Sequence, residues 1–341
     1  MIKALVTSCI VFLFASIFVC AQNIRLILKD SEKKVDVEID GKLFTSYRWD
    51  DRIKRPVLYP VMSAGGSFVT RGFPFETRND ETIDHPHQVG CSFSYGDVNG
   101  VDFWNTSTFR TAKELEKMGV IAHQEILSIK NGKGRGELVT RSNWIMPGGK
   151  DILFETTKYI FRAKGKIRTI DRETTLTANE TDVVFGDSKE GMFAIHVSSE
   201  LEQSDQIGIK VTSVDGVISE RKSTSIPSGE YLNSDGLVGD KVWGTLGKWA
   251  SVSGRIGNED VTVALFDLPK NHNFPSYMMV RGYGLLALNP FGRKLFDPSK
   301  EERHFTLPSK RSIKFRHRLV IMSEKAKGET IEKEYKAFIR S

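Results

Sequence analysis

The order of apolar and polar residues along the chain predicts strands far more often than helices. Between residues 312 and 321 the two kinds alternate, with Ile313, Phe315, His317, Leu319 and Ile321 on one side. This period of two is typical of a half-buried strand. Similar β-rich stretches occur at 152–162, 166–176, 193–198 and 261–268.

Turn-forming pairs such as Asn131-Gly132 and Asp215-Gly216 separate the β-rich stretches. Only the end of the chain has a clear helical period, because Ile331, Tyr335 and Phe338 are spaced four and three residues apart. The pattern therefore predicts an all-β fold, a large antiparallel β-sandwich that ends in a short C-terminal helix.

The first 21 residues resemble a secretory signal peptide. Lys3 is the only charge before Arg25, and an apolar run from Ala4 to Ala21 follows it. Cleavage after Ala21 leaves residues 22–341 as one sandwich domain, periplasmic or secreted. The alternative is a lipoprotein anchored through Cys20, although bulky residues precede that cysteine. No later segment has the roughly 20 apolar residues that span a bilayer.

Charge and cysteine content exclude several classes of protein. The net charge is +6, but the basic residues are scattered among 43 acidic ones, so a nucleic-acid-binding stripe is not expected. Mild attraction to an acidic polysaccharide remains open. Cys91 is the one cysteine left after cleavage, so no internal disulfide is expected. Its surroundings favour a buried strand residue over a nucleophile, and no cofactor motif is found.

The first stretch with candidate chemistry runs from residue 84 to residue 104. In extended backbone His85 and His87 point the same way, about 6.6 Å apart, which suits metal ligands or two imidazoles lining a pocket. Pro86 favours a loop or an edge. The alternative is a polar turn. Asp102 and Trp104 follow in the same stretch as candidate substrate-binding residues.

Two further stretches combine glycine, aromatic and ionisable residues. In 185–196, Asp187 and Glu190 precede an apolar strand, where a buried carboxylate can act as general acid or base; a charged hairpin turn is the alternative. In 267–292, Arg281, Tyr283 and Asn289 offer donors and an aromatic ring to sugar hydroxyls or a carboxylate; the alternative is that the glycines and prolines here only turn the chain. The lone His317 is expected to be a core residue.

Five motifs resemble the bacterial family called "methane oxygenase PmoA-like", over residues 56–318. They are DHPHxxG, GDVNGVDFW, FGDxKEG, VWG…W and RxYGLxALNPFG, beginning at residues 84, 96, 185, 242 and 281. The family label does not imply methane oxidation here, because that requires several membrane-spanning helices. The resemblance implies a galactose-mutarotase-like β-sandwich that handles sugars.

The sequence departs from that family at three positions. Gln88, Leu268 and Met279 stand where the relatives tend to carry histidine. The two remaining imidazoles of the first motif are fewer than the three or four ligands that hold zinc. No metal site is therefore expected.

Two functions follow as hypotheses. In the first, a sugar-converting enzyme uses Glu190 as base, His85 or His87 as acid and Arg281 to orient the substrate. A glycoside-cleaving version would take its second carboxylate from Asp187 or Asp267. The second hypothesis is a non-catalytic glycan-binding protein with a degenerate site. The enzyme hypothesis expects one cleft lined by the candidate residues His87, Glu190 and Arg281, with Trp104 or Tyr283 as a stacking wall.

Overall fold

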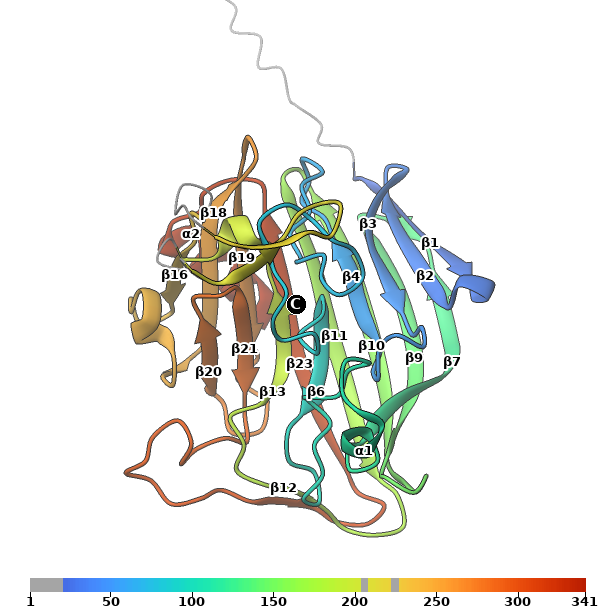
Figure 1. The fold of residues 1–341 in the computed structure, drawn as a ribbon. Coiled ribbons are helices and arrows are strands. Elements are labelled where there is room, and N and C mark those ends of the chain that lie inside the picture. Colours follow the sequence, from blue (N-terminus) through green and yellow to red (C-terminus); the bar gives the residue numbers. More distant parts are fainter. Residues whose placement is uncertain (1–20, 204–207, 222–226) are drawn as a thin grey trace, which may run out of the picture.

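A computed structural model describes residues 21–203, 208–221 and 227–341. Over these residues the chain is an antiparallel β-sandwich of two large sheets that face each other, with a short C-terminal helix (Figure 1). The predicted fold class is confirmed. The expected signal peptide lies outside the described residues except for Ala21, and so does Cys20.

The first sheet carries the candidate site. Its strands, in spatial order, are β17 (Leu246–Gly247), β20 (Ser276–Arg281), β21 (Leu285–Asn289), β13 (Gly191–His196), β6 (Cys91–Tyr95), β4 (Val57–Val61), β3 (Lys42–Arg48), β2 (Lys34–Ile39), β1 (Asn23–Lys29) and β8 (Gly132–Lys133). We call it the ten-stranded sheet. All five motifs supply strands, or loops beside strands, at the end formed by β17, β20, β21, β13 and β6.

The second sheet is built from longer strands. In spatial order they are β16 (Glu230–Asn233), β18 (Trp249–Ile256), β19 (Glu259–Asp267), β23 (Ser312–Met322), β11 (Ile167–Ala178), β10 (Asp151–Lys164), β9 (Arg135–Ile145) and β7 (Val120–Lys130). We call it the eight-stranded sheet. All the β-rich stretches predicted from the sequence except 193–198 lie in it.

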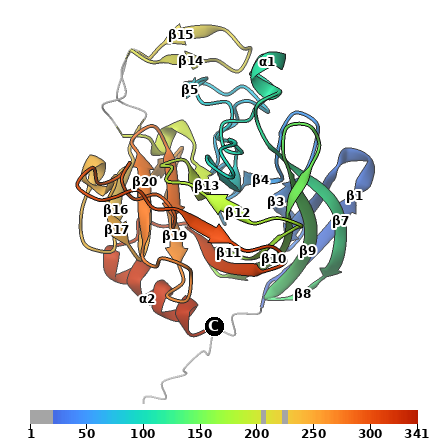
Figure 2. The same cartoon turned by 90° about the horizontal axis from the view of Figure 1, so that it is seen from below.

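Short elements decorate the sandwich. They are the small sheet of β5 (Glu81–Thr82), β14 (Lys210–Thr212) and β15 (Ile218–Glu220), the pair β12 (Val183–Phe185) and β22 (Phe305–Leu307), helices α1 (Ala112–Leu115) and α2 (Gly328–Ile339), and 3-10 turns at Asp30–Glu32, Ser199–Leu201 and Gly239–Val242. Figure 2 shows α2 outside the eight-stranded sheet and the small sheet on the opposite side of the molecule.

The core lies between the two large sheets, and strand alternation fills it. On β23, Phe315, Leu319 and Ile321 face inward as predicted, while Lys314 and Arg316 lie on the outer face. Cys91 is buried in β6, as expected. His317 is buried too, and its ring stacks on Phe193 at 5.1 Å.

Part of the outer face of the eight-stranded sheet is apolar, and helix α2 covers it. Ile331, Tyr335 and Phe338, the three residues that predicted the helix, pack with Phe266 and Val320. Burying this stripe is what stabilises a helix of only 12 residues, since isolated helices of that length are marginal in water. Within the described residues, no helix has the length and apolarity needed to cross a membrane.

Candidate functional site

The outer face of the ten-stranded sheet carries a second apolar layer. On β13, Phe193 and Ile195 face the core, so Ala194 and His196 point to the opposite side. There Ala194 joins a cluster that comprises Trp104, Tyr277, Met279, Leu285, Ala287 and Phe296, with Trp243 and Tyr283 at its margin. The loops that carry the predicted motifs meet on this layer.

His85 is held between an acidic and an aromatic partner. Its Nδ1 lies 2.7 Å from Asp84 Oδ2, and its ring stacks on Tyr283 at 4.7 Å. Asp84 in turn accepts a hydrogen bond from the buried Arg71 at 3.0 Å. Burial acts to raise the pKa of Asp84, but the hydrogen bond with His85 and the charge of Arg71 outweigh it and hold the pKa well below its usual range. Asp84 is therefore ionised and fixes the orientation of His85.

The extended backbone predicted for His85 and His87 is wrong. His85 has φ of +46°, in the left-handed region, so the segment is a turn that follows β5 rather than a strand. The turn still brings the two imidazoles close, with ring centroids 5.8 Å apart.

His87 is buried, whereas the enzyme hypothesis requires it to be accessible to a sugar. Burial, together with the nearby charges of Arg55 and His85, lowers the pKa of His87 to about 3, so its imidazole is neutral at neutral pH. The carbonyl of His87 accepts a hydrogen bond from Arg55, which also donates to the Trp104 carbonyl at 2.7 Å. The cavity against His87 holds about 10 Å³, roughly one water molecule, so this cavity has no room for a sugar.

Glu190 lies in the electrostatic field of three other predicted residues. Its half-buried carboxylate is 3.9 Å from Lys189 Nζ. Burial raises the pKa of Glu190; the charge of Lys189 opposes the shift, Asp102 adds to it, and Arg281 and His85 oppose it. Asp102, Arg281 and His85 therefore all act electrostatically on the carboxylate of Glu190.

Arg281 is the last residue of β20, and Tyr283 follows it. The guanidinium of Arg281 lies 4.5 Å from the centre of the Trp243 ring, a cation–π contact that holds Arg281 at the margin of the apolar layer. The Tyr283 hydroxyl accepts a hydrogen bond from Gln88 at 3.4 Å. Burial raises the pKa of Tyr283, so its hydroxyl stays protonated and can donate.

Asp187 and Asn289, predicted as catalytic and substrate-binding residues, are occupied by the backbone. Asp187 accepts hydrogen bonds at 2.9 Å from the N–H groups of Arg293, Lys294 and Arg303. The buried Asn289 donates to the Ser188 carbonyl and accepts from two N–H groups of the same loop. These contacts fold the loop between β21 and β22 and give both side chains a structural role.

Trp104 and Asp102 also differ from expectation. The Trp104 ring is only 1% exposed, so it cannot be an open stacking wall, although its Nε1 has no hydrogen-bond partner among the described residues. Asp102 accepts hydrogen bonds from the N–H groups of Trp104 and Asn105 and from the Asn105 side chain. Its charge nevertheless reaches Glu190, as noted above.

Asp267, the other candidate for a second carboxylate, lies on the eight-stranded sheet. It is completely buried, and burial raises its pKa to about 6. It accepts hydrogen bonds from Asn271 and Ser276, and His317 lies 3.6 Å away. Asp267 is a core residue and cannot pair with Glu190 in glycoside cleavage.

His196 and Arg71 were not predicted as site residues. His196 Nε2 lies 2.9 Å from the Tyr283 carbonyl, and its Nδ1 has no hydrogen-bond partner in the described part of the chain. Burial and the charge of Arg71 lower the pKa of His196 well below its usual value. Strand parity could have found His196, because it shares the outer face of β13 with Ala194.

The three positions that depart from the resembled family do not form one group. Gln88 touches Tyr283, and Met279 belongs to the apolar layer, whereas Leu268 packs beside α2 on the other sheet. Within residues 21–203, 208–221 and 227–341, no group of three or more His, Cys, Asp or Glu side chains could hold a metal ion.

A family model described as a family of unknown function, DUF6807, matches residues 34–336. The chain belongs to this family. This match gives no evidence for the methane oxygenase PmoA-like family, and the resemblance to that family stays an expectation. No curated protein matches the chain.

Several solved structures resemble the DUF6807 chain at low identity. They include the GH36 α-galactosidase AgaB from Geobacillus stearothermophilus (11% identity, TM-score 0.42, 88% of this chain and 41% of that one), the α-galactosidase from Lactobacillus brevis (7%, 0.41, 89% and 40%), and the Slr1438 protein from Synechocystis (10%, 0.33, 88% and 96%). This chain spans about two fifths of the length of the galactosidases. At these identities and TM-scores the likeness gives no information on activity.

Proposed function

We propose that this chain is a carbohydrate-active protein whose site is the neighbourhood of Glu190, His85, Arg281 and Tyr283 on the outer face of the ten-stranded sheet. The observation that carries the proposal is the environment of Glu190, a half-buried carboxylate with a raised pKa on which the charges of Arg281 and His85 act. A carboxylate that is a stronger base than usual, next to a group that can supply a proton, suits acid–base chemistry on a sugar.

In the proposed reaction Glu190 removes the proton from the anomeric hydroxyl of a sugar. The ring carbon–oxygen bond breaks, and the ring oxygen takes a proton from His85. Closure on the other face of the carbonyl reverses both transfers. His85 is favoured over His87 as the acid, because His87 is buried and neutral while His85 remains about one third exposed in its side chain. Arg281 orients the sugar hydroxyls.

A glycoside-cleaving version is less well supported. It needs two carboxylates across the scissile bond, and Asp187 and Asp267 are both committed to structural contacts. Asp102 is the remaining carboxylate near Glu190, and its oxygens already accept three hydrogen bonds. We therefore propose ring-opening interconversion ahead of hydrolysis.

A second candidate function is binding of a glycan without turnover. It is favoured by the stacking of His85 on Tyr283, which already covers one ring face that a reacting sugar would otherwise use. The two candidate functions use the same residues. They differ because turnover of a sugar needs an ionised Glu190, whereas binding of a glycan does not.

The test combines a glycan panel with matched variants of the full chain. Binding and anomer interconversion are measured for the protein, for Glu190→Gln and for Glu301→Gln, an exposed control. Loss of turnover by about a hundredfold or more in Glu190→Gln alone, with binding retained, supports the enzyme. Binding without turnover in the unchanged protein supports the second candidate. Equal binding and turnover in both variants and the unchanged protein contradicts the proposed site.

We further propose that the protein is exported, with cleavage after Ala21, and that residues 22–341 act as one domain. In support, β1 begins at Asn23, and the Gln22 side chain is already tied to Asp40 and Arg168. Mass spectrometry of the protein recovered from the bacterial envelope tests this. A terminus at Gln22 is expected, whereas a lipid on Cys20 supports the anchored alternative and an uncleaved chain contradicts export.

A further inference from the structure

The outer face of the eight-stranded sheet holds a charged cavity, on the other sheet from Glu190. Its volume is about 400 Å³, and it opens over β10, β11 and β23 beside the segment that follows β19. The lining residues that matter to its chemistry are Lys158, Glu173, Leu268, Lys270, Lys314 and Arg316. Cavities of this size hold small organic ligands.

The lining carries more positive than negative charge. Lys158 pairs with Glu137 at 3.2 Å, and the Arg316 Nε lies 3.4 Å from Glu173, the one carboxylate of the lining. Lys270 and Lys314 are exposed and make no ion pair with any residue that the structure describes. Two ammonium groups at one cavity are thus left without a counter-charge.

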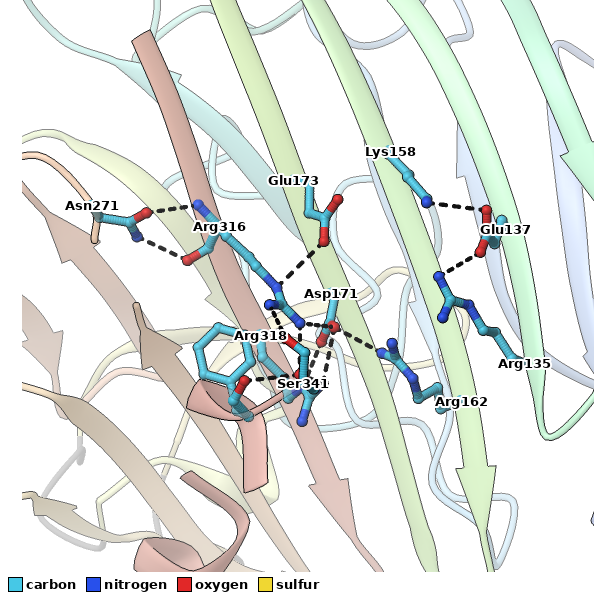
Figure 3. Close-up of polar contacts among 11 residues, drawn as sticks. Arg135, Glu137, Lys158, Arg162, Asp171, Glu173, Asn271, Arg316, Arg318 and Ser341 are labelled. Carbon is cyan, nitrogen blue, oxygen red and sulfur yellow. Dashed lines mark hydrogen bonds and ion pairs between the residues drawn. The ribbon is translucent and has the colours of Figure 1, made fainter. Parts of the chain in front are cut away.

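A buried carboxylate holds Arg316, one of the lining residues, in place (Figure 3). Asp171 is completely buried and is shared by Arg162 at 2.7 Å, Arg316 at 3.1 Å and Arg318 at 2.9 Å. Of the three guanidinium groups only that of Arg316 lines the cavity, so Asp171 fixes the position of this one lining charge. The Arg316 side chain also donates to the Ser341 carbonyl at 2.7 Å, which restricts its motion.

The rim is fixed by one amide side chain. Asn271 donates to the Arg316 carbonyl and accepts from the Arg316 N–H, both at 2.8 Å, and it also donates to Asp267 at 2.7 Å. Figure 3 shows Asn271 against the backbone of β23. These contacts hold the neighbouring Leu268 and Lys270 beside the strand that carries Lys314 and Arg316.

We propose that this cavity binds an acidic saccharide through its carboxylate or sulfate group. Lys270, Lys314 and Arg316 supply the charge that an oxyanion needs. Thr156 and Thr175 make no side-chain hydrogen bond within the described chain, and they offer hydroxyls to the sugar.

A nucleic acid suits the cavity less well than a saccharide. The one aromatic residue of the lining, Phe315, is buried and offers no face on which a base could stack. Leu268 supplies a half-buried apolar surface to the non-polar face of a sugar ring instead. The cavity is independent of Glu190, so this proposal stands whether or not the proposed function holds.

Calorimetric titration of the full chain tests the proposal with four probes: an oligogalacturonate, a sulfated oligosaccharide, a neutral oligosaccharide of equal length, and inorganic sulfate. We expect both acidic oligosaccharides to bind, more weakly as salt is raised, and the neutral one not to bind. The double variant Lys270→Ala/Lys314→Ala should weaken binding by about fivefold or more. Glu173→Gln should strengthen it, because the only negative charge of the lining is removed.

The control is Lys42→Ala, an exposed lysine on β3 of the other sheet, which should bind like the unchanged protein. Three results overturn the proposal. They are unchanged binding in the double variant, sulfate bound as tightly as the sulfated oligosaccharide, and a short DNA duplex bound with the same dependence on Lys270 and Lys314.

Discussion

The imidazole of His85 lies almost parallel to the ring of Tyr283, with an interplanar angle of 8° and centroids 4.7 Å apart. The two residues come from motifs far apart in the chain, and the outer face of the ten-stranded sheet brings them together. His85 also has a positive φ, a conformation that costs a residue with a side chain about 1 kcal/mol or more. The contacts with Tyr283 and Asp84 hold it there.

Replacing His85 by glycine should therefore separate stability from function. Glycine adopts a positive φ without strain, so His85→Gly should have a melting temperature closer to that of the unchanged protein than His85→Ala has. Both variants should lose turnover of the sugar that the unchanged protein converts. Thermal unfolding and the anomer assay check the two effects. Full activity in either variant would remove His85 from the proposed site.

Replacing His317 by phenylalanine should make the protein more resistant to acid. Burial, with a smaller effect from Arg172, lowers the pKa of His317 to about 3, and its ring nitrogens have no hydrogen-bond partner among the described residues. Below about pH 6.5 the unfolded chain therefore binds a proton on this histidine, whereas the folded protein binds that proton only below about pH 3. Stability is thus lost as the pH falls through this window.

In His317→Phe that contribution is absent, and the new ring can stack between Phe193 and Phe315. We expect the free energy of unfolding, measured with urea between pH 7 and pH 4, to fall less steeply than in the unchanged protein. His304→Ala, at an exposed histidine, is the control and should keep the original slope. An unchanged slope in His317→Phe would contradict the prediction.

Asp171→Asn should be strongly destabilising. It removes the negative charge that Arg162, Arg316 and Arg318 share at a completely buried position, and breaking such a group typically costs about 3–5 kcal/mol (Figure 3). Glu137→Gln is the matched control, because Glu137 pairs with Arg135 and Lys158 at a more exposed position and should change stability by less than about 1 kcal/mol. Denaturant unfolding compares them. Equal losses would mean that burial does not govern the Asp171 group.

Purified protein without an affinity tag should contain no stoichiometric transition metal. His85 already shares its Nδ1 with Asp84, and Gln88 and Met279 stand where the resembled family tends to carry histidine. Two imidazoles are fewer than the ligands zinc requires. Elemental analysis after dialysis checks this, and a metal-to-protein ratio near one would refute it.

The sequence was a good guide where structure follows from local period. The alternation in 312–321 and the helical spacing of Ile331, Tyr335 and Phe338 appear as β23 and α2, because burial of one face determines both. The shared cleft of His87, Glu190 and Arg281 was expected because a sandwich brings distant strands side by side, and it stays a prediction, since spacing along the chain cannot say which strands become neighbours.

Other features depended on strand pairing and could not be predicted locally. The pairing of β13 with β21 puts His196 beside the Tyr283 segment, and Leu268 lies on the other sheet from Gln88 and Met279. Asp187 and Asn289 lie in stretches with the composition of a site, but Asp187 accepts from the backbone of a loop about a hundred residues later, and Asn289 donates to the backbone next to Asp187. Residue type alone did not reveal which polar side chains would form hydrogen bonds with the backbone.

The amide of Asn271 has a consequence for the behaviour of the protein in concentrated solution. Strand β19 pairs with β23 only as far as His317. Along residues 312–316, the edge of β23 on the β19 side has no partner strand in the described chain. Asn271 occupies the N–H and carbonyl of Arg316 there, as a neighbouring peptide would. It thereby blocks the template that a strand from another molecule could extend, and so protects an open sheet edge from aggregation and fibril growth.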